Sequence, residues 1–334
     1  MTTPKAPLVH LVRIAFTLAV ILGPGGALAF DLSPDATRVV SDPAYLPAQG
    51  RFFGSTLYTY GKTTSDLDNY LGLPQSSNQT TVRTATQLFE YGASDDLTFR
   101  LSGFYQSIGS TGNYASGATT FTRSGGMSDP TLGLTWRFLD QARHAVSVDF
   151  VGSYTPDLIY ARSATSSSEG TVARGGATGV LGAAVSRKTK SFTVYGEATA
   201  TSLGTRAIQN PSNNVVTNYD TSWQYTLFLT TQSRLTGRWS LNLGLAETVN
   251  DRIAASFVNT VGKLVEFTNT PGRDTRLNAA LNFQVVPNRL VASVTYTHDT
   301  YCQGSNNFPV QFKSDTTTPD KKSSSIGVDL RYVL

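Results

Sequence analysis

The sequence has little of three things on which most soluble enzymes depend: charge, cysteine and histidine. Only 15% of the 334 residues are charged, against about 25% in an average globular domain. The formal net charge, 27 basic minus 23 acidic residues or +4, is too small for a nucleic-acid-binding protein. One cysteine, Cys302, excludes an intrachain disulfide and a zinc site built from several cysteines. We therefore expect no metal, no other cofactor and no nucleic-acid partner.

Long apolar runs are also missing. A membrane-spanning helix needs about 20 apolar residues, and no run downstream of the N-terminus is that long. The one apolar run near the start, residues 14–22, follows Lys5 and Arg13 and precedes an Ala-Leu-Ala motif that ends at Ala29. This order of basic, apolar and small residues is that of a secretory signal peptide. We predict a signal peptide over residues 1–29.

The chain is instead rich in glycine (29), tyrosine (15) and phenylalanine (17), with many Thr and Ser, a composition typical of half-exposed strands and turns. From residue 50 onward, apolar and polar residues alternate, most clearly where Leu132, Leu134 and Trp136 are interleaved with polar or small residues. Alternation with a period of two indicates strands with two different faces. Over residues 50–334 we predict an all-β fold, a transmembrane antiparallel up-and-down β-barrel of about twelve strands.

The expected connections alternate in length. Short turns are predicted at residues 93–96, 140–143, 187–190, 234–237 and 287–289, and long loops between them, such as 107–129 and 299–322. Outer-membrane barrels have short periplasmic turns and long extracellular loops, whereas a soluble β-sandwich has no reason to sort its loops. We therefore predict a bacterial outer-membrane protein with both termini in the periplasm. Residues 30–49, rich in Pro and Ala, would form a short periplasmic segment, or fold into the lumen.

Aromatic residues on the apolar faces agree with this placement. Those expected near the short turns include Phe89, Tyr91, Phe99, Trp136, Phe138 and Trp239, and those near the long loops include Tyr58, Tyr60, Tyr105, Tyr154, Trp223 and Tyr296. Two aromatic rings around an apolar band are typical of a lipid-facing surface. We therefore expect outer-membrane lipids as partners.

The chain ends with apolar or aromatic residues at alternate positions, from Ile326 to Leu334, with Tyr332 as the aromatic. This ending resembles the C-terminal signal that the barrel-assembly machinery reads. The resemblance implies that machinery as a partner, although Leu334 replaces the usual terminal Phe. An ordinary amphipathic last strand would show the same alternation.

The opposite faces of the strands are polar. The side chains that we predict to line the lumen are Glu90, Arg100, Arg137, Asp149, Glu197, Gln224, Asn242, Asn282, Asp329 and Arg331. Their acidic and basic groups nearly cancel, which argues against strong ion selectivity. The same groups could instead satisfy one another across a filled lumen, so a polar pathway and a structural barrel both stay open.

A catalytic site is poorly supported. After signal removal only His144 and His298 remain, and a Ser/His hydrolase needs a histidine beside its nucleophile and a third group that orients it. His298 is expected at the external end of a strand, where outer-membrane phospholipases and lipid A deacylases carry out their chemistry. Their sequence motifs are absent, so a lipid-modifying esterase with a site near His298 is kept only as an alternative, and no catalytic residue is assigned.

The segment GGMSDPTLGL, residues 125–134, followed by Trp136, Arg137 and Phe138, resembles a stretch of the outer-membrane family named after the meta-pathway of phenol degradation. A second piece of that family's pattern, a PTG-like turn, is only partly matched by residues 154–157. The resemblance implies a transporter or channel for small organic compounds, such as aromatic ones. Diffusion of such solutes into the periplasm is therefore our first hypothesis, ahead of an esterase and a structural barrel.

Overall fold

The computed structural model describes residues 40–68, 74–114, 116–211, 213–270, 272–301, 304–307, 316–318 and 321–334. The predicted signal peptide, residues 1–29, lies outside this part of the chain, and so do residues 30–39 of the segment that follows it. Among the described residues, no helix is long and apolar enough to cross a membrane. The strands of a β-sheet position most of the side chains discussed below.

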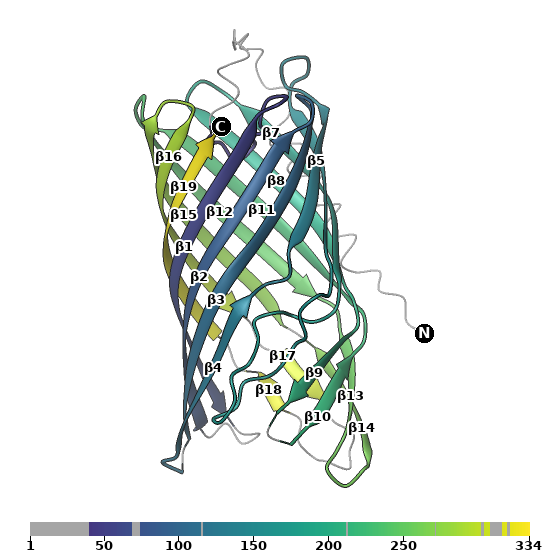
Figure 1. Ribbon diagram of the computed structural model, residues 1–334. Coiled ribbons are helices and arrows are strands. Elements are labelled where there is room, and N and C mark those ends of the chain that lie inside the picture. The colour runs from purple at the N-terminus through teal and green to yellow at the C-terminus, as the bar shows by residue number, and fades with distance from the viewer. Residues whose placement is uncertain are drawn as a thin grey trace.

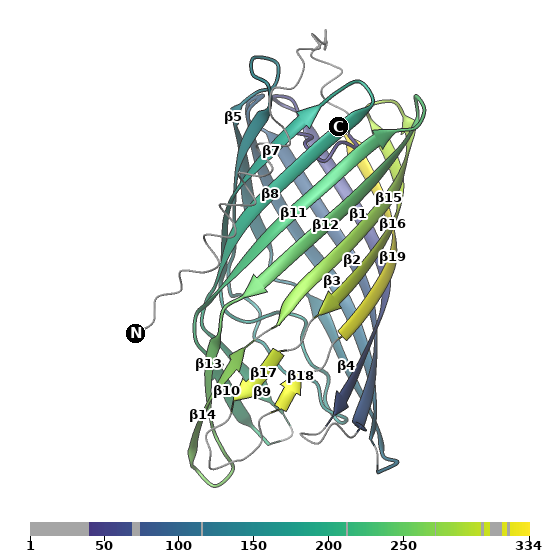
Figure 2. The same cartoon turned by 180° about the vertical axis from the view of Figure 1, so that it is seen from behind.

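Twelve antiparallel strands close into a barrel (Figures 1 and 2). They are β1 (Phe52–Asp68), β2 (Pro74–Gly92), β3 (Leu97–Tyr114), β5 (Thr131–Leu139), β6 (Ser147–Thr155), β7 (Thr178–Lys188), β8 (Phe192–Leu203), β11 (Ser222–Arg234), β12 (Trp239–Asn250), β15 (Arg273–Val286), β16 (Leu290–Tyr301) and β19 (Lys321–Val333). The first strand pairs with the last, β1 with β19, so all backbone groups at this seam have partners. The predicted fold class and strand number are confirmed.

The two ends of the barrel differ, as the loop lengths predicted. The short turns and the C-terminus lie together at the upper end in Figure 1, and the long connections lie at the other end. Those connections are largely strands rather than irregular loops. Six short strands form a separate sheet there: β9 (Arg206–Asn210), β10 (Val215–Tyr219), β13 (Ile253–Val258), β14 (Leu264–Thr270), β17 (Gly304–Asn307) and β18 (Thr316–Thr318). The longest of these strands has seven residues, which is too short for the extended alternation on which the sequence prediction relied.

On the edge away from β2, strand β3 has two successive partners. It pairs with β5 over Leu97–Ser102 and with β4 (Thr119–Met127) over Tyr105–Asn113, so β4 and β5 lie end to end along it. Ser128, Asp129 and Pro130 separate the two strands. Proline has no N–H to donate to a ladder, and the Asp129 carboxylate accepts two backbone hydrogen bonds of 2.9 Å from Leu158 and Ile159. Residues 125–134, which resemble the phenol-degradation family, therefore cover the end of β4, this three-residue interruption and the start of β5.

Side chains alternate between the two surfaces of the wall as predicted. Phe99, Leu132, Trp136 and Tyr154 are exposed on the outside, where lipid would cover them. Their polar neighbours, such as Thr135, point inward and are buried. The apolar outside and polar inside are the reverse of a soluble domain and are typical of an outer-membrane barrel.

Candidate functional site in the barrel interior

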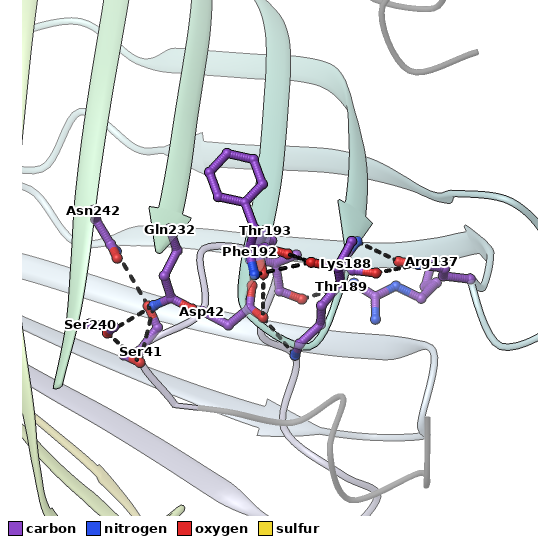
Figure 3. A network of polar contacts seen from close by, with 12 residues as sticks. Ser41, Asp42, Arg137, Lys188, Thr189, Phe192, Thr193, Gln232, Ser240 and Asn242 are labelled. Atoms are coloured by element: carbon purple, nitrogen blue, oxygen red, sulfur yellow. Dashed lines mark hydrogen bonds and ion pairs between the residues drawn. The ribbon is translucent and has the colours of Figure 1, made fainter. Parts of the chain in front are cut away.

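Residues 40–49, here called the luminal segment, lie inside the short-turn end of the barrel. Ser41 and Asp42 are almost completely buried, with exposed fractions of 0% and 3%. The Asp42 carboxylate forms a 2.6 Å ion pair with Lys188 at the end of β7. It also accepts a hydrogen bond from Thr193 on β8 (Figure 3). Residues 40–49 of the N-terminal segment are therefore anchored to the wall of the lumen.

The backbone of the luminal segment is fixed as well. The Gln232 side-chain amide donates to the Ser41 carbonyl oxygen at 2.7 Å, and Asn242 donates to the same oxygen at 3.3 Å (Figure 3). Val40 packs against Phe53 and Val291 in a small apolar cluster. Polar bonds on one side and apolar packing on the other hold the segment across the lumen.

Arg137 joins the luminal segment to the wall at a third point. Its guanidinium binds both carboxylate oxygens of Asp149, at 2.8 and 3.0 Å, and donates to the Ala44 carbonyl oxygen at 3.0 Å. A bidentate arginine-carboxylate pair fixes the guanidinium plane. The orientation of Arg137 is thereby set for its bond to the segment.

All of the side chains predicted to line the lumen lie on the inward face, and each is bonded to another described side chain. The ion pairs are Glu90 with Arg100, Arg137 with Asp149 and Asp329 with Arg331; the hydrogen-bonded pairs are Tyr195 with Glu197, Gln224 with Asn250 and Asn282 with Asn242. Such pairing is what buried polar groups require. Whether solutes pass between them stays a prediction.

A cavity of about 470 Å³ adjoins the luminal segment inside the barrel. Its wall combines the ion pair of Glu90 and Arg100 with aromatic and aliphatic side chains, among them Tyr45, Leu57 and Phe228. Cavities for small organic ligands have volumes of about 300–1,000 Å³ and pair apolar lining with a few polar groups. The cavity therefore has the size and chemistry to hold a small, mostly apolar molecule.

His298 lies elsewhere, on the outside of the barrel. It shares the face of Tyr296, and its Nδ1 lies 2.9 Å from the hydroxyl oxygen of Ser324 on β19. The neighbouring carboxylate, Asp299, points inward and pairs with Arg276, so it does not orient the imidazole. His144 is exposed in the turn between β5 and β6.

Arg137 and Asn242 were predicted to line the lumen, but sequence reasoning missed three other residues that hold the luminal segment, Lys188, Thr193 and Gln232. Lys188 was assigned to a short turn, and the structure places it as the last residue of β7 with its ammonium inside the barrel. Asp42 lies 146 positions away in the sequence, and no local pattern reports a contact over that distance. The one available signal was the carboxylate of Asp42, which lies in residues 39–49, a mostly apolar stretch with no basic residue.

A closed barrel with an apolar, aromatic-ringed outside and a polar inside defines the class: a bacterial outer-membrane β-barrel protein. Comparison with solved structures agrees on the fold. An outer-membrane channel from Pseudomonas putida F1 aligns with a TM-score of 0.53 at 16% identity, over 88% of this chain and 99% of that one.

Two further structures align less well. The transport unit of the autotransporter AIDA-I from Escherichia coli has a TM-score of 0.49 at 11% identity, over 88% of this chain and 95% of that one. The TodX monoaromatic hydrocarbon channel has 0.44 at 12% identity, over 87% and 92%. No family model and no curated protein matches the sequence, so the resemblance to the phenol-degradation family stays a prediction.

Proposed function

We propose that the protein is an outer-membrane channel through which small organic solutes, including aromatic compounds, diffuse into the periplasm. The observation that carries this proposal is the cavity of about 470 Å³ within the lumen, beside the luminal segment. Phe228 and Tyr195 line the cavity and pack edge to face, with ring centroids 6.3 Å apart, and their aromatic surface favours apolar solutes.

The charges around the cavity support weak ion selectivity. Glu90, Asp149, Glu197 and Asp329 lie among Arg100, Arg137 and Arg331, and the luminal segment adds the pair of Asp42 and Lys188. A ring of one sign would select ions strongly, and the described part of this wall has none. The wall therefore gives ions no electrostatic preference over neutral solutes.

Passage requires the luminal segment to move, because its residues occupy the short-turn end of the lumen. The segment is held by a small number of polar side chains on β5, β7, β8, β11 and β12, together with the apolar contacts of Val40. Breaking a few polar bonds would free it without disturbing the barrel ladder. In this proposal, the arrangement with the segment docked is the closed state of the channel, and the channel opens when these bonds break.

Two measurements test the proposal. Planar bilayers containing the refolded mature chain should show discrete conductance steps, and vesicles containing it should take up phenol faster than protein-free vesicles. Narrowing the cavity with Gly244→Leu should slow phenol uptake, because Gly244 lines the cavity. The matched control, Leu243→Ala on the lipid face of the same strand, should not. A protein that is silent in bilayers and passes no phenol would favour a structural barrel with a filled lumen.

The hydrogen bond between His298 and Ser324 favours a second candidate, an esterase acting on outer-leaflet lipids. The pair supplies a nucleophile and a base on the lipid-facing surface, the positions that acyl transfer requires. A fluorophosphonate probe should then label the protein, and Ser324→Ala should abolish the label. Absence of labelling in the unmodified chain would remove this candidate.

The last strand supports assembly by the barrel-assembly machinery. Ile326, Val328 and Leu330 of β19 are exposed on the lipid face, and the strand closes the barrel against β1. Replacing Tyr332 and Leu334 by Ser should lower the amount of folded protein in the outer membrane. The same two changes should leave refolding in detergent much less affected, since they act on recognition.

A further inference from the structure

Three basic side chains lie on the lipid-facing surface of neighbouring strands. Lys322 of β19, Lys62 of β1 and Arg83 of β2 are all exposed. They share the outward face with Ile326, Tyr58 and Phe89, which are also exposed. The three residues are called the basic belt below.

The strand registers place these cations side by side. Lys62 pairs with Ser324 and Thr81, each two residues from a member of the belt, so Lys322 and Arg83 are its diagonal neighbours. Diagonal neighbours lie roughly 7–8 Å apart. The front strands lean from upper right to lower left in Figure 1, with β2 to the right of β1. For strands tilted by roughly 40°, this diagonal runs nearly parallel to the membrane and keeps Lys322 and Arg83 each within about 2 Å of the height of Lys62.

The belt lies at the outer edge of the bilayer. Lys62 is ten residues beyond Phe52, which starts β1 at the short-turn end. At about 3.4 Å per residue and a tilt of roughly 40°, ten residues rise about 26 Å. The apolar band of an outer-membrane barrel is about 25 Å tall. The three cations therefore lie just above the hydrocarbon, at the level of lipid headgroups, with Tyr58 and Tyr60 beneath them.

On β19, β1, β2 and β3, no described carboxylate shares the outward face with the belt. Among the described side chains of β19, β1, β2 and β3, the acidic residues are Asp329 and Glu90, and both point into the lumen. Cross-strand neighbours of the belt on the outside are hydroxyl residues and Tyr60. The one described carboxylate near the belt is Glu169 of the loop beside Arg83, so the three cations keep a positive excess that an external anion would balance.

A groove beside Arg83 extends the belt outward. It has a volume of about 570 Å³ and is lined by Tyr60, Arg83, Tyr105, Ser107 and Arg123, with Glu169 at one side. Two guanidiniums, hydroxyl groups and aromatic rings offer both charge-assisted bonds to phosphate oxygens and apolar contact. The groove is thus suited to a group that is phosphorylated and also carries sugar or acyl chains.

We propose that the basic belt and this groove bind the phosphate groups of a phosphorylated glycolipid of the outer leaflet, of the lipid A type. Charge complementarity, the height of the belt and the tyrosines beneath it commit the site to a lipid. The inference goes beyond the proposed transport and does not depend on it.

The experiment measures binding of purified bisphosphorylated lipid A to the refolded mature chain in detergent, by native mass spectrometry. A Lys62→Gln, Arg83→Gln, Lys322→Gln variant should bind about a hundredfold more weakly, since each basic group near an anionic surface contributes roughly a factor of five. The matched control, Arg143→Gln, Lys190→Gln, Arg238→Gln, removes the same charge from exposed positions at the short turns and should bind as the unmodified chain does.

The proposal would be overturned if the belt variant bound lipid A as tightly as the unmodified chain, or if the control variant lost as much affinity as the belt variant. It would also be overturned if the unmodified chain bound dephosphorylated lipid A as tightly as the bisphosphorylated form. Displacement of the lipid by inorganic phosphate at millimolar concentration would also overturn it, because the site would then serve a free anion. A Lys62→Arg, Lys322→Arg variant should keep the affinity, which separates loss of charge from loss of fold, and heat-modifiable gel mobility checks that each barrel has closed.

Discussion

Replacing Asp42 by Asn should open the channel. The carboxylate of Asp42 pairs with Lys188 at 2.6 Å, and the side chains are only 1% and 8% exposed. Removing one partner leaves a buried ammonium without its counter-ion, which costs about 3–5 kcal/mol when a buried pair is broken. That cost applies to the docked state of the luminal segment alone, because Lys188 meets water once the segment leaves.

A difference of about 3 kcal/mol changes the ratio of docked to released segment by roughly 150-fold. If the segment is released for about a thousandth of the time in the unmodified chain, it would be released for more than a tenth of the time in the Asp42→Asn variant. Single-channel recording of the refolded chain measures this open fraction directly. Asp96→Asn is the control, since Asp96 is an exposed carboxylate in a turn at the same end of the barrel.

The double change Asp42→Asn, Lys188→Met tests the cause. Methionine leaves no buried charge, so the luminal segment should dock again and the open fraction should fall toward that of the unmodified chain. If the single and double variants open equally, the ion pair does not hold the segment. If Asp42→Asn has the open fraction of Asp96→Asn, the reasoning from burial and charge is wrong.

Three further predictions concern the wall. Leu134→Arg should destabilise the refolded barrel by about 2–4 kcal/mol, and Thr135→Arg by much less, because only Leu134 faces lipid; equal losses in urea titrations would contradict the facing. Glu197→Gln removes one inward acid and should shift the reversal potential in a salt gradient toward anions, and an unchanged potential would place Glu197 away from the pathway. His298→Ala should leave conductance unchanged, since His298 lies outside the lumen, and a fall in conductance would show otherwise.

Much of the wall was predictable from the sequence because its two environments impose a period of two. Leu134 and Thr135 were assigned to opposite faces from alternation alone, and so was the inward position of Arg137. The choice of partner was not predictable. The bond of Arg137 to Asp149 depends on the register between β5 and β6, which shifts at a bulge after Arg137.

The contacts of the luminal segment were beyond prediction for a different reason. Asp42 contacts Thr193 and Lys188, and Ser41 contacts Gln232, across 146 to 191 positions. Contacts between residues so far apart in the sequence produce no periodic pattern in it. The outer sheet was not predicted for a third reason. Strands such as β13 and β14 have only six and seven residues, and each has one buried apolar side chain, Ala255 and Val265, so neither shows an extended alternation.

The ion pairs inside the wall have a consequence for how the barrel is built. Glu90 and Arg100 face each other across the β2–β3 hairpin, and Arg137 and Asp149 across the β5–β6 hairpin, 10 and 12 positions apart. Each hairpin thus carries its own counter-charge before any other strand arrives. An unpaired charge in hydrocarbon is costly, so a nascent barrel can add each of these two hairpins with the charges of its ion pair already neutralised. The pair of Asp42 and Lys188 follows the opposite rule and can form only after β7 is in place.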